Sequence, residues 1–278
     1  MFALCAWYDS SRMSGWVLLD YDSRGNPLHA FELVRADSRW DIHLRACVEI
    51  ADQVALIADR LGVRLAGPDG GPPGWTHTIS ISSEIRVVQT ALELLQSVLT
   101  VPPPPELEVV LALDFFKTPP GPEPGATWGW TEVGGWVSRA KYTKSPWTRR
   151  KYGGRVADHL GRVMVSHPLY HDADAVIAAP FTENPFGALL ARSVAARVGK
   201  PFFECHRRTE RVAPAKGGQA LQTLEDCQIE DLAGVATAVV IDDVYRSGRT
   251  MRSTAAAAAT AGAQRVLGLV PARTLRKT

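Results

Sequence analysis

In the second half of the chain, short and uniformly apolar runs alternate with amphipathic segments of helical spacing. The apolar runs lie at 173–179, 201–204, 237–241 and 264–271. Helices are predicted at 184–198, ended by Gly199, and at 251–261. A run without polar positions is typical of a strand buried on both faces, as in parallel sheets. Strands separated by single helices imply right-handed crossovers, so we expect an α/β fold with a parallel sheet flanked by helices.

The first half groups its strands and helices differently. The predicted elements are strands at 3–8, 15–21 and 28–34, a helix from about 41 to 61, a loop at 67–74, a strand at 76–82, a helix from about 83 to 98 and a strand at 106–116. Asp41 or a neighbour would begin the first helix, and Ser83 would cap the second. This order predicts a smaller α+β domain ahead of the parallel sheet.

The clearest break in composition is the Pro- and Gly-rich segment 118–125. Such segments are typical of linkers, so we predict domains at 1–125 and 126–278. The first would be a substrate-specificity domain or another α+β domain of unknown role. Trp128, Trp130 and Trp136 follow the break and are interpreted as packing residues.

A basic segment, Lys141–Arg155, has Tyr142, Trp147 and Tyr152 between its cations. Basic residues alternating with aromatic ones can contact a nucleic-acid backbone or a phosphate-rich substrate. The simpler interpretation is the solvated beginning of a helix that continues through 155–165. Both interpretations stay open at this point.

The overall composition is that of an ordinary globular protein, with 46% hydrophobic and 22% charged residues and a net charge of +2. The small net charge neither indicates nor excludes nucleic acid. The four cysteines form no C-x-x-C pair and the seven histidines show no ligand spacing, so no zinc site is expected. Without a signal-peptide pattern or a run of about 20 apolar residues, we expect a cytoplasmic protein with no membrane association.

The chemistry of the chain is concentrated in residues 239–251, Val-Val-Ile-Asp-Asp-Val-Tyr-Arg-Ser-Gly-Arg-Thr-Met. An apolar strand ends there at two adjacent carboxylates, Asp242 and Asp243. A turn around Gly248 then opens a helix, and such a turn presents free N–H groups and the positive helix end to an anion. Ligands of α/β sheets bind beyond the carboxyl ends of strands. These features predict a phosphate site beside two acids suited to ribose hydroxyls or a metal.

This stretch resembles the phosphoribosyl pyrophosphate (PRPP) motif of type I phosphoribosyltransferases, and every position fits that motif. The resemblance implies that Asp242 and Asp243 hold the ribose hydroxyls. It also implies a phosphate loop made of Arg246, Ser247, Gly248, Arg249 and Thr250. The expected ligands are PRPP or a phosphorylated ribose, a nucleobase acceptor and Mg²⁺, with Asp242 and Asp243 nearest the metal through the ribose. We also expect a homo-oligomer.

Weaker matches across residues 137–275 resemble the ComF-like branch of this family, whose members are associated with DNA uptake. The matching pieces are Lys141-Tyr142, Ala179-Pro180, the run from Phe186 to Ala191, Arg207-Arg208 and Ala272-Arg273-Thr274. Residues 248–252 are also similar to the uracil phosphoribosyltransferase and pyrimidine-regulator branch, which is the second choice. The Cys-rich zinc module with which ComF-like proteins usually begin is replaced here by an unrelated domain.

The loop expected to bind pyrophosphate also departs from the family. It should contain Pro180, Phe181, Thr182 and Glu183, and residues 180–185 include no Lys or Arg. An anion would therefore rely there on backbone N–H groups, on Mg²⁺ or on cations from elsewhere. Lys216, a candidate catalytic residue in a Gly-rich loop, and Arg207 or Arg208 are candidates; the alternative is that they are solvated loop charges.

Two functions follow from the resemblance. The first is a phosphoribosyltransferase, in which a nitrogen nucleophile attacks C1 of PRPP and displaces pyrophosphate. The second is a non-catalytic module of the ComF type that senses PRPP or a nucleotide, or engages nucleic acid, through the same pocket. The cation-poor pyrophosphate loop favours the second function, and the paired acids are compatible with both.

A third hypothesis concerns the first domain, whose order of strands and helices is similar to the RNase H-like arrangement. Asp9, Glu49 and Asp114 fall where acidic metal ligands would lie on that fold. Such a site would cleave nucleic acid with two metal ions. The residues around these acids match no motif, and a structural or specificity domain is the competing interpretation.

Overall fold

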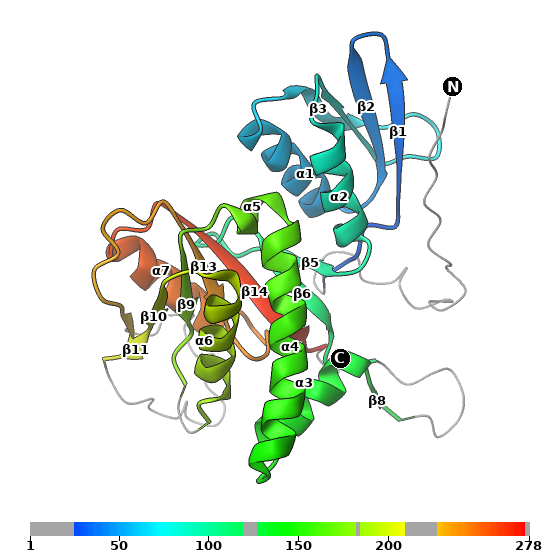
Figure 1. Ribbon diagram of the computed structural model, residues 1–278. Coiled ribbons are helices and arrows are strands. Elements are labelled where there is room, and N and C mark those ends of the chain that lie inside the picture. Colours follow the sequence, from blue (N-terminus) through cyan, green and yellow to red (C-terminus); the bar gives the residue numbers. More distant parts are fainter. Residues whose placement is uncertain (1–24, 119–126, 182–183, 209–226, 276–278) are drawn as a thin grey trace, which may run out of the picture. The chain divides into compact units, whose positions relative to one another are not determined.

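A computed structural model describes residues 25–118, 127–181, 184–208 and 227–275. The chain forms two compact units, drawn in Figure 1. The first unit comprises the chain to Pro102 together with Val163–His171, and the second comprises Pro103–Arg162 and Asp172–Thr278. The strands predicted at 3–8 and 15–21 lie outside the described residues. No helix of the described part is long and apolar enough to cross a membrane.

The first unit contains an antiparallel sheet with the strand order β1-β2-β4-β3. These strands are β1 (Ala30–Ala36), β2 (Arg39–Arg45), β3 (Arg64–Gly70) and β4 (His77–Ile81). Helix α1 (Val48–Arg60) packs on one face, where the strand residues Ile42, Leu44, Ile79 and Ile81 are fully buried, and helix α2 (Ile85–Leu95) packs against α1. Apolar residues at every second position therefore give this sheet one buried face.

The predicted helix from 41 to 61 was wrong at its beginning. Asp41 lies in β2, and the helix begins only at Val48. Residues 40–44 instead follow a period of two and pair with both β1 and β4. The predicted loop at 67–74 was also partly wrong, because 64–70 form the edge strand β3. Its pairing with β4 is irregular, and edge strands with irregular pairing tolerate the Gly and Pro residues found here.

The helix predicted from Ser83 is confirmed as α2, but Ser83 is not its cap. Glu84 occupies the N-cap position with a left-handed backbone, and its side chain makes no capping hydrogen bond. The predicted strand at 76–82 is confirmed as β4.

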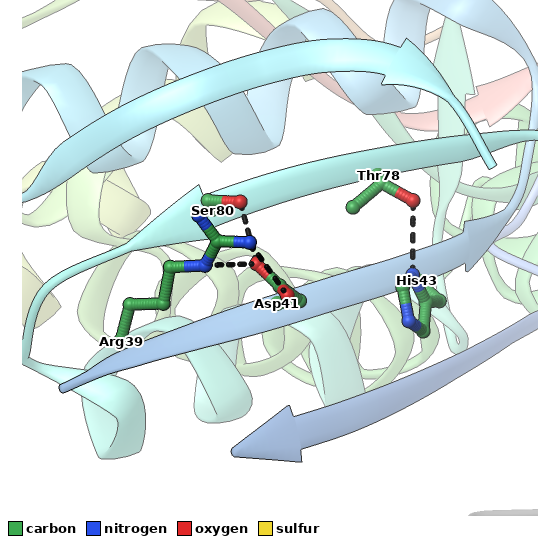
Figure 2. A network of polar contacts seen from close by, with 5 residues as sticks. All are labelled: Arg39, Asp41, His43, Thr78 and Ser80. Atoms are coloured by element: carbon green, nitrogen blue, oxygen red, sulfur yellow. Dashed lines mark hydrogen bonds and ion pairs between the residues drawn. The ribbon is translucent and has the colours of Figure 1, made fainter. Parts of the chain in front are cut away.

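The outer face of the first sheet carries a row of polar contacts between β2 and β4 (Figure 2). Ser80 Oγ donates a hydrogen bond to Asp41 Oδ1 over 2.5 Å, and Arg39 Nε lies 3.2 Å from the same oxygen. One pair further along, His43 Nδ1 lies 2.9 Å from Thr78 Oγ1. The two contacts between strands, Asp41–Ser80 and His43–Thr78, join residues directly opposite in the register, so strand pairing brings them together. Arg39 reaches Asp41 from two positions earlier on the same strand.

The core of the first unit contains three polar side chains that are joined by hydrogen bonds. Thr100, on β5 (Leu99–Val101), donates a hydrogen bond to Gln53 Oε1 over 3.1 Å. Gln53 Nε2 in turn lies 2.7 Å from His167 Nε2. His167 directly precedes the short helix α5 (Pro168–His171). All three side chains are buried. Because the Gln53 oxygen accepts from Thr100, its amide group donates to His167, whose Nε2 must then carry no proton.

The second unit is built on a parallel sheet, as predicted. Its strands are β6 (Val110–Phe115), β9 (Ala175–Ala178), β10 (Phe202–Glu204), β13 (Thr237–Ile241) and β14 (Arg265–Arg273). They follow the order β10-β9-β13-β14-β6, and neighbouring strands are parallel. Every residue of β9 and β13 is buried, which confirms the interpretation of the uniformly apolar runs.

Two helices connect these strands in opposite directions. From β9, helix α6 (Phe186–Val198) leads outward to β10, and from β13, helix α7 (Arg249–Thr260) leads the other way to β14. Right-handed crossovers in opposite directions place α6 and α7 on opposite faces of the sheet. Figure 1 shows this arrangement. The chain therefore changes direction between β9 and β13, which makes their carboxyl ends the topological switch point.

Two further helices belong to this part of the chain. Helix α3 (Glu132–Tyr142), which was not predicted, begins at its N-cap Thr131 and packs on β6 and β14. Its Gly134 is required because a Cβ there would lie 1.9 Å from the Phe116 carbonyl oxygen. Helix α4 (Pro146–Ser166) includes the predicted helical segment 155–165.

Short strand pairs border the described parts of the second unit. Strand β7 (Lys117–Thr118) pairs with β8 (Gly129–Trp130), and β11 (His206–Arg207) pairs with β12 (Cys227–Gln228). The first pair joins the two sides of the Pro- and Gly-rich segment. Strand β6, which the sequence places before the domain boundary, pairs with β14 in the second unit. The domain limits 1–125 and 126–278 stay a prediction about folding units.

Candidate functional site

Asp242 and Asp243 lie directly after β13, at the topological switch point. β13 is paired with β9 on one side and β14 on the other, so the chain leaves the sheet with both carboxylates at its carboxyl edge. The backbone N–H of Asp243 donates a 2.8 Å hydrogen bond to Asp242 Oδ1, which fixes that side chain. A Cβ placed on Gly187, in the first turn of α6, would lie 3.7 Å from the same oxygen. The Asp pair therefore faces the beginning of α6.

The turn after the Asp pair ends at Gly248, the N-cap of α7. Gly248 has φ +73°, and a Cβ there would lie 2.3 Å from the Tyr245 hydroxyl. Only glycine combines this left-handed backbone with this close contact. Arg246 and Ser247 are exposed, while Arg249 and Thr250 are half-buried in the first turn of the helix. The turn thus holds the N-terminus of a twelve-residue helix beside two carboxylates.

Hydrogen bonds from the end of strand β14 hold this turn in position. Tyr245 N donates to the Ala272 carbonyl over 2.8 Å, and Thr274 N donates back to the Tyr245 carbonyl over 2.9 Å. The Arg273 guanidinium lies 4.8 Å from the centre of the Tyr245 ring and donates to the carbonyl oxygens of Tyr245 and Arg246. The turn is therefore attached to the sheet at several backbone groups.

A lysine from helix α3 completes the cluster. Lys141 Nζ lies 2.8 Å from Asp243 Oδ2, with 22% and 13% of the two side chains exposed. Asn184 Nδ2 donates to the Lys141 carbonyl over 2.7 Å, and Asn184 Oδ1 accepts from the N–H of Phe186 in α6. Asn184 thus links the end of α3 to the beginning of α6, and both helices border the Asp pair.

The charges of the cluster influence one another. Burial, and then the charge of Asp243, raise the pKa of Asp242 to about 7, although the N–H of Asp243 and the charges of Lys141 and Arg207 act in the opposite direction. Burial disfavours the charged form of Lys141, but its hydrogen bond to Asp243 and the nearby negative charges outweigh this and raise its pKa. Asp242 therefore exchanges its proton near neutral pH in the protein without ligand.

The other predicted site residues are only partly described. Pro180 is buried two residues after the end of β9, and the N–H of the intervening Ala179 donates to the Ile241 carbonyl. The Phe181 side chain is 48% exposed. Thr182, Glu183 and Lys216 lie outside the described residues. Arg207 lies on β11 and acts electrostatically on Asp242, whereas Arg208 lines a different cavity beside α7.

Sequence reasoning noted Lys141 as part of a basic segment and of a branch pattern but missed its position as the partner of Asp243. It also missed Asn184 as the link between two helices. The two residues are separated from Asp243 by 102 and 59 positions, and no spacing rule connects them. The sequence did offer one signal: Lys141 lies shortly before Pro146, and a proline is common at the first position of a helix, so Lys141 could be placed near the end of the preceding element.

Among the described residues, no group of three or more His, Cys, Asp or Glu side chains could hold a metal by itself. Of the acids in the RNase H-like hypothesis, Asp9 lies outside the described residues. Glu49 lies on α1 of the first unit, and Asp114 lies on β6 in the sheet of the second. Burial raises the pKa of Asp114, and the Phe115 N–H donates to its carboxylate. The described residues therefore show no acidic cluster in the first sheet.

No family model and no curated protein match this sequence. Solved structures do. The similar structures are phosphoribosyltransferases. A purine phosphoribosyltransferase from Pyrococcus horikoshii is 16% identical, with a TM-score of 0.31, over 45% of this chain and 82% of that one. An adenine phosphoribosyltransferase from Thermoanaerobacter pseudethanolicus is 14% identical, with a TM-score of 0.34, over 57% and 94%.

A third similar structure is the adenine phosphoribosyltransferase of Trypanosoma brucei, in complex with AMP, pyrophosphate and ribose-5-phosphate. It is 15% identical, with a TM-score of 0.34, over 55% of this chain and 72% of that one. The three matches extend over about half of this chain. With identities and TM-scores this low, they carry no inference about what this chain binds or catalyses.

Proposed function

We propose that the chain binds PRPP at the carboxyl ends of β9 and β13 and transfers its phosphoribosyl group to a nitrogen acceptor. The observation that carries this proposal is the position of Asp242 and Asp243 at the topological switch point, seven and six residues before the helix that begins at Arg249. In this position two carboxylates can accept hydrogen bonds from ribose hydroxyls. The N–H groups of residues 246–250 would bind the 5-phosphate at the positive end of α7.

The chemistry would be a displacement at C1 of the ribose. The lone pair of the acceptor nitrogen forms the N–C1 bond while the C1–O bond to pyrophosphate breaks, and the nitrogen loses its proton to water. Developing positive charge on the ribose favours an anionic surrounding, which Asp242 and Asp243 supply. Positioning by the turn and the Asp pair supplies the rest, because no covalent enzyme intermediate is needed.

The Asp pair would also hold Mg²⁺ together with oxygens of the ligand. Mg²⁺ typically binds proteins through one or two carboxylates plus substrate phosphates, and it keeps several waters. Two adjacent carboxylates fit that pattern, since the metal needs no third protein ligand. When bound, the ion would neutralise charge on pyrophosphate, which matters here because residues 180–185 contain no Lys or Arg. The residues proposed for that loop are Pro180, Phe181, Thr182 and Glu183, with Lys216 as a further catalytic candidate.

Titration calorimetry with PRPP and MgCl₂ tests the binding site. We expect the double variant Asp242→Asn plus Asp243→Asn to lose at least about 100-fold in affinity, since each factor of ten is about 1.4 kcal/mol. Asp172→Asn, which changes an exposed acid of the same unit, should bind like the unchanged chain. PRPP affinity that survives the double substitution would contradict the proposal.

A second candidate function, the non-catalytic module of the ComF type, is favoured by the surface of α3 and α4. Trp147 and Tyr142 are 68% and 67% exposed. Lys151 Nζ lies 4.9 Å from the Trp147 ring centre and 5.5 Å from that of Tyr152. Exposed rings beside cations can stack on bases and contact phosphates of a single strand.

Fluorescence anisotropy with a labelled oligo-dT strand tests this second function. We expect binding that weakens with salt and falls about tenfold in Trp147→Ala, because stacking on one base contributes about 1–3 kcal/mol. Release of pyrophosphate from PRPP in the presence of any nucleobase would instead establish catalysis and exclude a purely non-catalytic module.

A further inference from the structure

A small cavity opens where β6 and β14 end, on the same edge of the sheet as the Asp pair. Its volume is about 200 Å³, and it is lined by Phe116, Lys117, Trp128, Thr274 and Leu275. Phe116 and Lys117 continue from β6, and Thr274 and Leu275 continue from β14. The two strands are parallel, so their carboxyl ends meet at this point. The cavity therefore lies where α/β sheets bind their ligands.

Two of the five residues that line this cavity, Phe116 and Trp128, are aromatic, and Trp130 lies beside Phe116. Phe116 and Trp130 are in edge-to-face contact, with ring centres 5.0 Å apart and planes at 80°. Trp130 lies on β8, where it pairs with Lys117 of β7, and Trp128, two residues earlier in the chain, lines the cavity together with Lys117 and Phe116. Aromatic walls favour flat, apolar faces in a ligand. A volume below the roughly 300–1,000 Å³ of ordinary ligand pockets indicates a single ring rather than a whole nucleotide.

The cavity also carries one positive charge. Lys117 Nζ lies 4.3 Å from the centre of the Trp130 ring, which holds the ammonium group beside the aromatic walls. Within the part of the chain that the structure describes, Lys117 has no ion pair with a carboxylate. A ligand carboxylate would provide a charge-assisted hydrogen bond that none of the described carboxylates supplies there.

Backbone hydrogen bonds connect the residues that line the cavity to the turn that follows the Asp pair. Thr274, which lines the cavity, donates from its backbone to the Tyr245 carbonyl, and Tyr245 donates to Ala272. The backbone of Phe116 donates to the Arg273 carbonyl over 2.8 Å. One strand end thus supports both the turn before Gly248 and the aromatic cavity, so ligands at the two places would be close neighbours.

We propose that this cavity binds the acceptor and that the acceptor is a single-ring aromatic carboxylate bearing a nitrogen nucleophile. Phe116 and Trp128 would contact the ring, and Lys117 would pair with the carboxylate. This inference rests on the proposed function, because the nitrogen would attack C1 of PRPP held by Asp242 and Asp243. The N–C1 bond forms, the C1–O bond to pyrophosphate breaks, and the nitrogen's proton passes to water.

The probe for this proposal is 2-aminobenzoate, with 2-aminobenzamide as its neutral counterpart of nearly equal shape. Quenching of tryptophan fluorescence in the full chain, with and without PRPP and MgCl₂, reports binding of each. We expect the carboxylate to bind at least tenfold more tightly than the amide. Lys117→Met should abolish this preference, Lys117→Arg should keep it, and Lys144→Met, at a lysine outside the cavity, should not change it.

Each variant is also titrated with PRPP, so that the two proposals can fail separately. Lys117→Met should bind PRPP within about twofold of the unchanged chain, which also shows that the variant is folded. Equal binding of the acid and the amide, or an unchanged preference in Lys117→Met, would overturn the cavity's assignment and leave the PRPP site standing. A Lys117-dependent preference without PRPP binding would support the cavity and overturn the proposed function.

Discussion

Each unit of the molecule hides a polar cluster with one ionisable group whose pKa is strongly perturbed by burial, but the two clusters are built differently. In the first unit, His167 ends a chain of side-chain hydrogen bonds through Gln53 to Thr100, and all three side chains lie in the core. In the second, Asp242 stands at the end of a buried strand, with Asp243 and Lys141 beside it and each Asp side chain still partly exposed. One cluster is closed, whereas the other is open.

The pKa shifts of His167 and Asp242 have opposite consequences for what each cluster can do. Burial lowers the pKa of His167 to about 3, so the ring stays neutral and acts as a hydrogen-bond acceptor in the core. Burial raises the pKa of Asp242 to about 7. The negative charge of Asp243 adds to this rise, and the positive charges of Lys141 and Arg207 offset it only in part. The first arrangement suits structural stability. The second leaves a cost that a ligand with hydroxyl donors or a metal would relieve.

The largest predicted effect concerns His167. Its folded-state pKa is lowered, so below pH 6.5 the unfolded chain binds a proton that the folded chain excludes. The free energy of unfolding should therefore fall as the pH drops from about 6.5 towards 3, by about 3 kcal/mol at pH 4 from this group. Thermal unfolding between pH 7 and pH 4 measures this loss.

The matching variants are His167→Gln, which stays neutral at every pH, and His171→Gln, at an exposed position on α5. His167→Gln should start less stable at pH 7 but lose much less on acidification. His171→Gln should follow the unchanged chain. If His167→Gln showed the same acid-induced loss as the unchanged chain, the closed cluster would not be its origin.

The second largest effect concerns Gly248, in the turn that follows the Asp pair, where the backbone conformation and the contact with Tyr245 both require glycine. Gly248→Ala introduces a Cβ into the Tyr245 side chain at φ +73°, whereas Gly199→Ala has φ +66° and no atom within 4 Å. The left-handed strain of about 1 kcal/mol is common to both. We expect Gly248→Ala to cost about 2 kcal/mol more and to weaken PRPP binding at least tenfold. Chemical denaturation and calorimetry give both values, and equal costs for the two variants would contradict the account of the turn.

The third effect has the opposite pH dependence from that of His167. The folded-state pKa of Asp242 is raised, so between about pH 4 and 7 the unfolded chain gives up a proton that the folded chain keeps. Stability is therefore lost as the pH rises through this window. Asp242→Asn removes this loss, and we expect it to stabilise the ligand-free chain by about 1–2 kcal/mol at pH 8, after allowing for solvent screening, and not at pH 4.

Melting temperatures at pH 4 and pH 8 check this expectation, with Asp172→Asn as the exposed control. A variant that gained nothing at pH 8 while PRPP binding was lost would separate ligand binding from the burial cost of Asp242. That outcome would mean that burial of the Asp242 carboxylate does not cost the ligand-free chain stability.

The smallest effect belongs to the polar row on the outer face of the first sheet (Figure 2). Asp41→Asn keeps an acceptor for the Ser80 hydroxyl but removes the charge facing Arg39. Because Arg39 is 52% exposed, water screens this ion pair, and we expect a loss below about 1 kcal/mol. Denaturation by urea is the measurement. A loss above about 2 kcal/mol would mean that this face is energetically closer to a closed cluster than to an exposed surface.

The pattern of apolar positions was enough to predict the parallel sheet, and the residues after one of its strands were enough to predict the turn at which we propose that a ligand binds. Strands β9 and β13 are apolar at every position, and only a strand covered on both faces has that pattern. The Asp pair and Gly248 were recognisable for a similarly local reason, since an acidic strand end and a helix-opening turn are adjacent in the chain. In the first half, Trp40, Ile42 and Leu44 fit both a strand and a helix, and the predicted helical period was wrong at these positions.

The residues that join these local features from far away in the chain are brought there by the packing of whole elements. Lys141 reaches Asp243 because α3 lies along β6 and β14, and β6 enters the sheet beside β14 although it precedes the Pro- and Gly-rich segment. Gln53, Thr100 and His167 meet for the same kind of reason. Such contacts depend on sheet order and helix packing, which are set by the burial of whole faces rather than by any spacing along the chain.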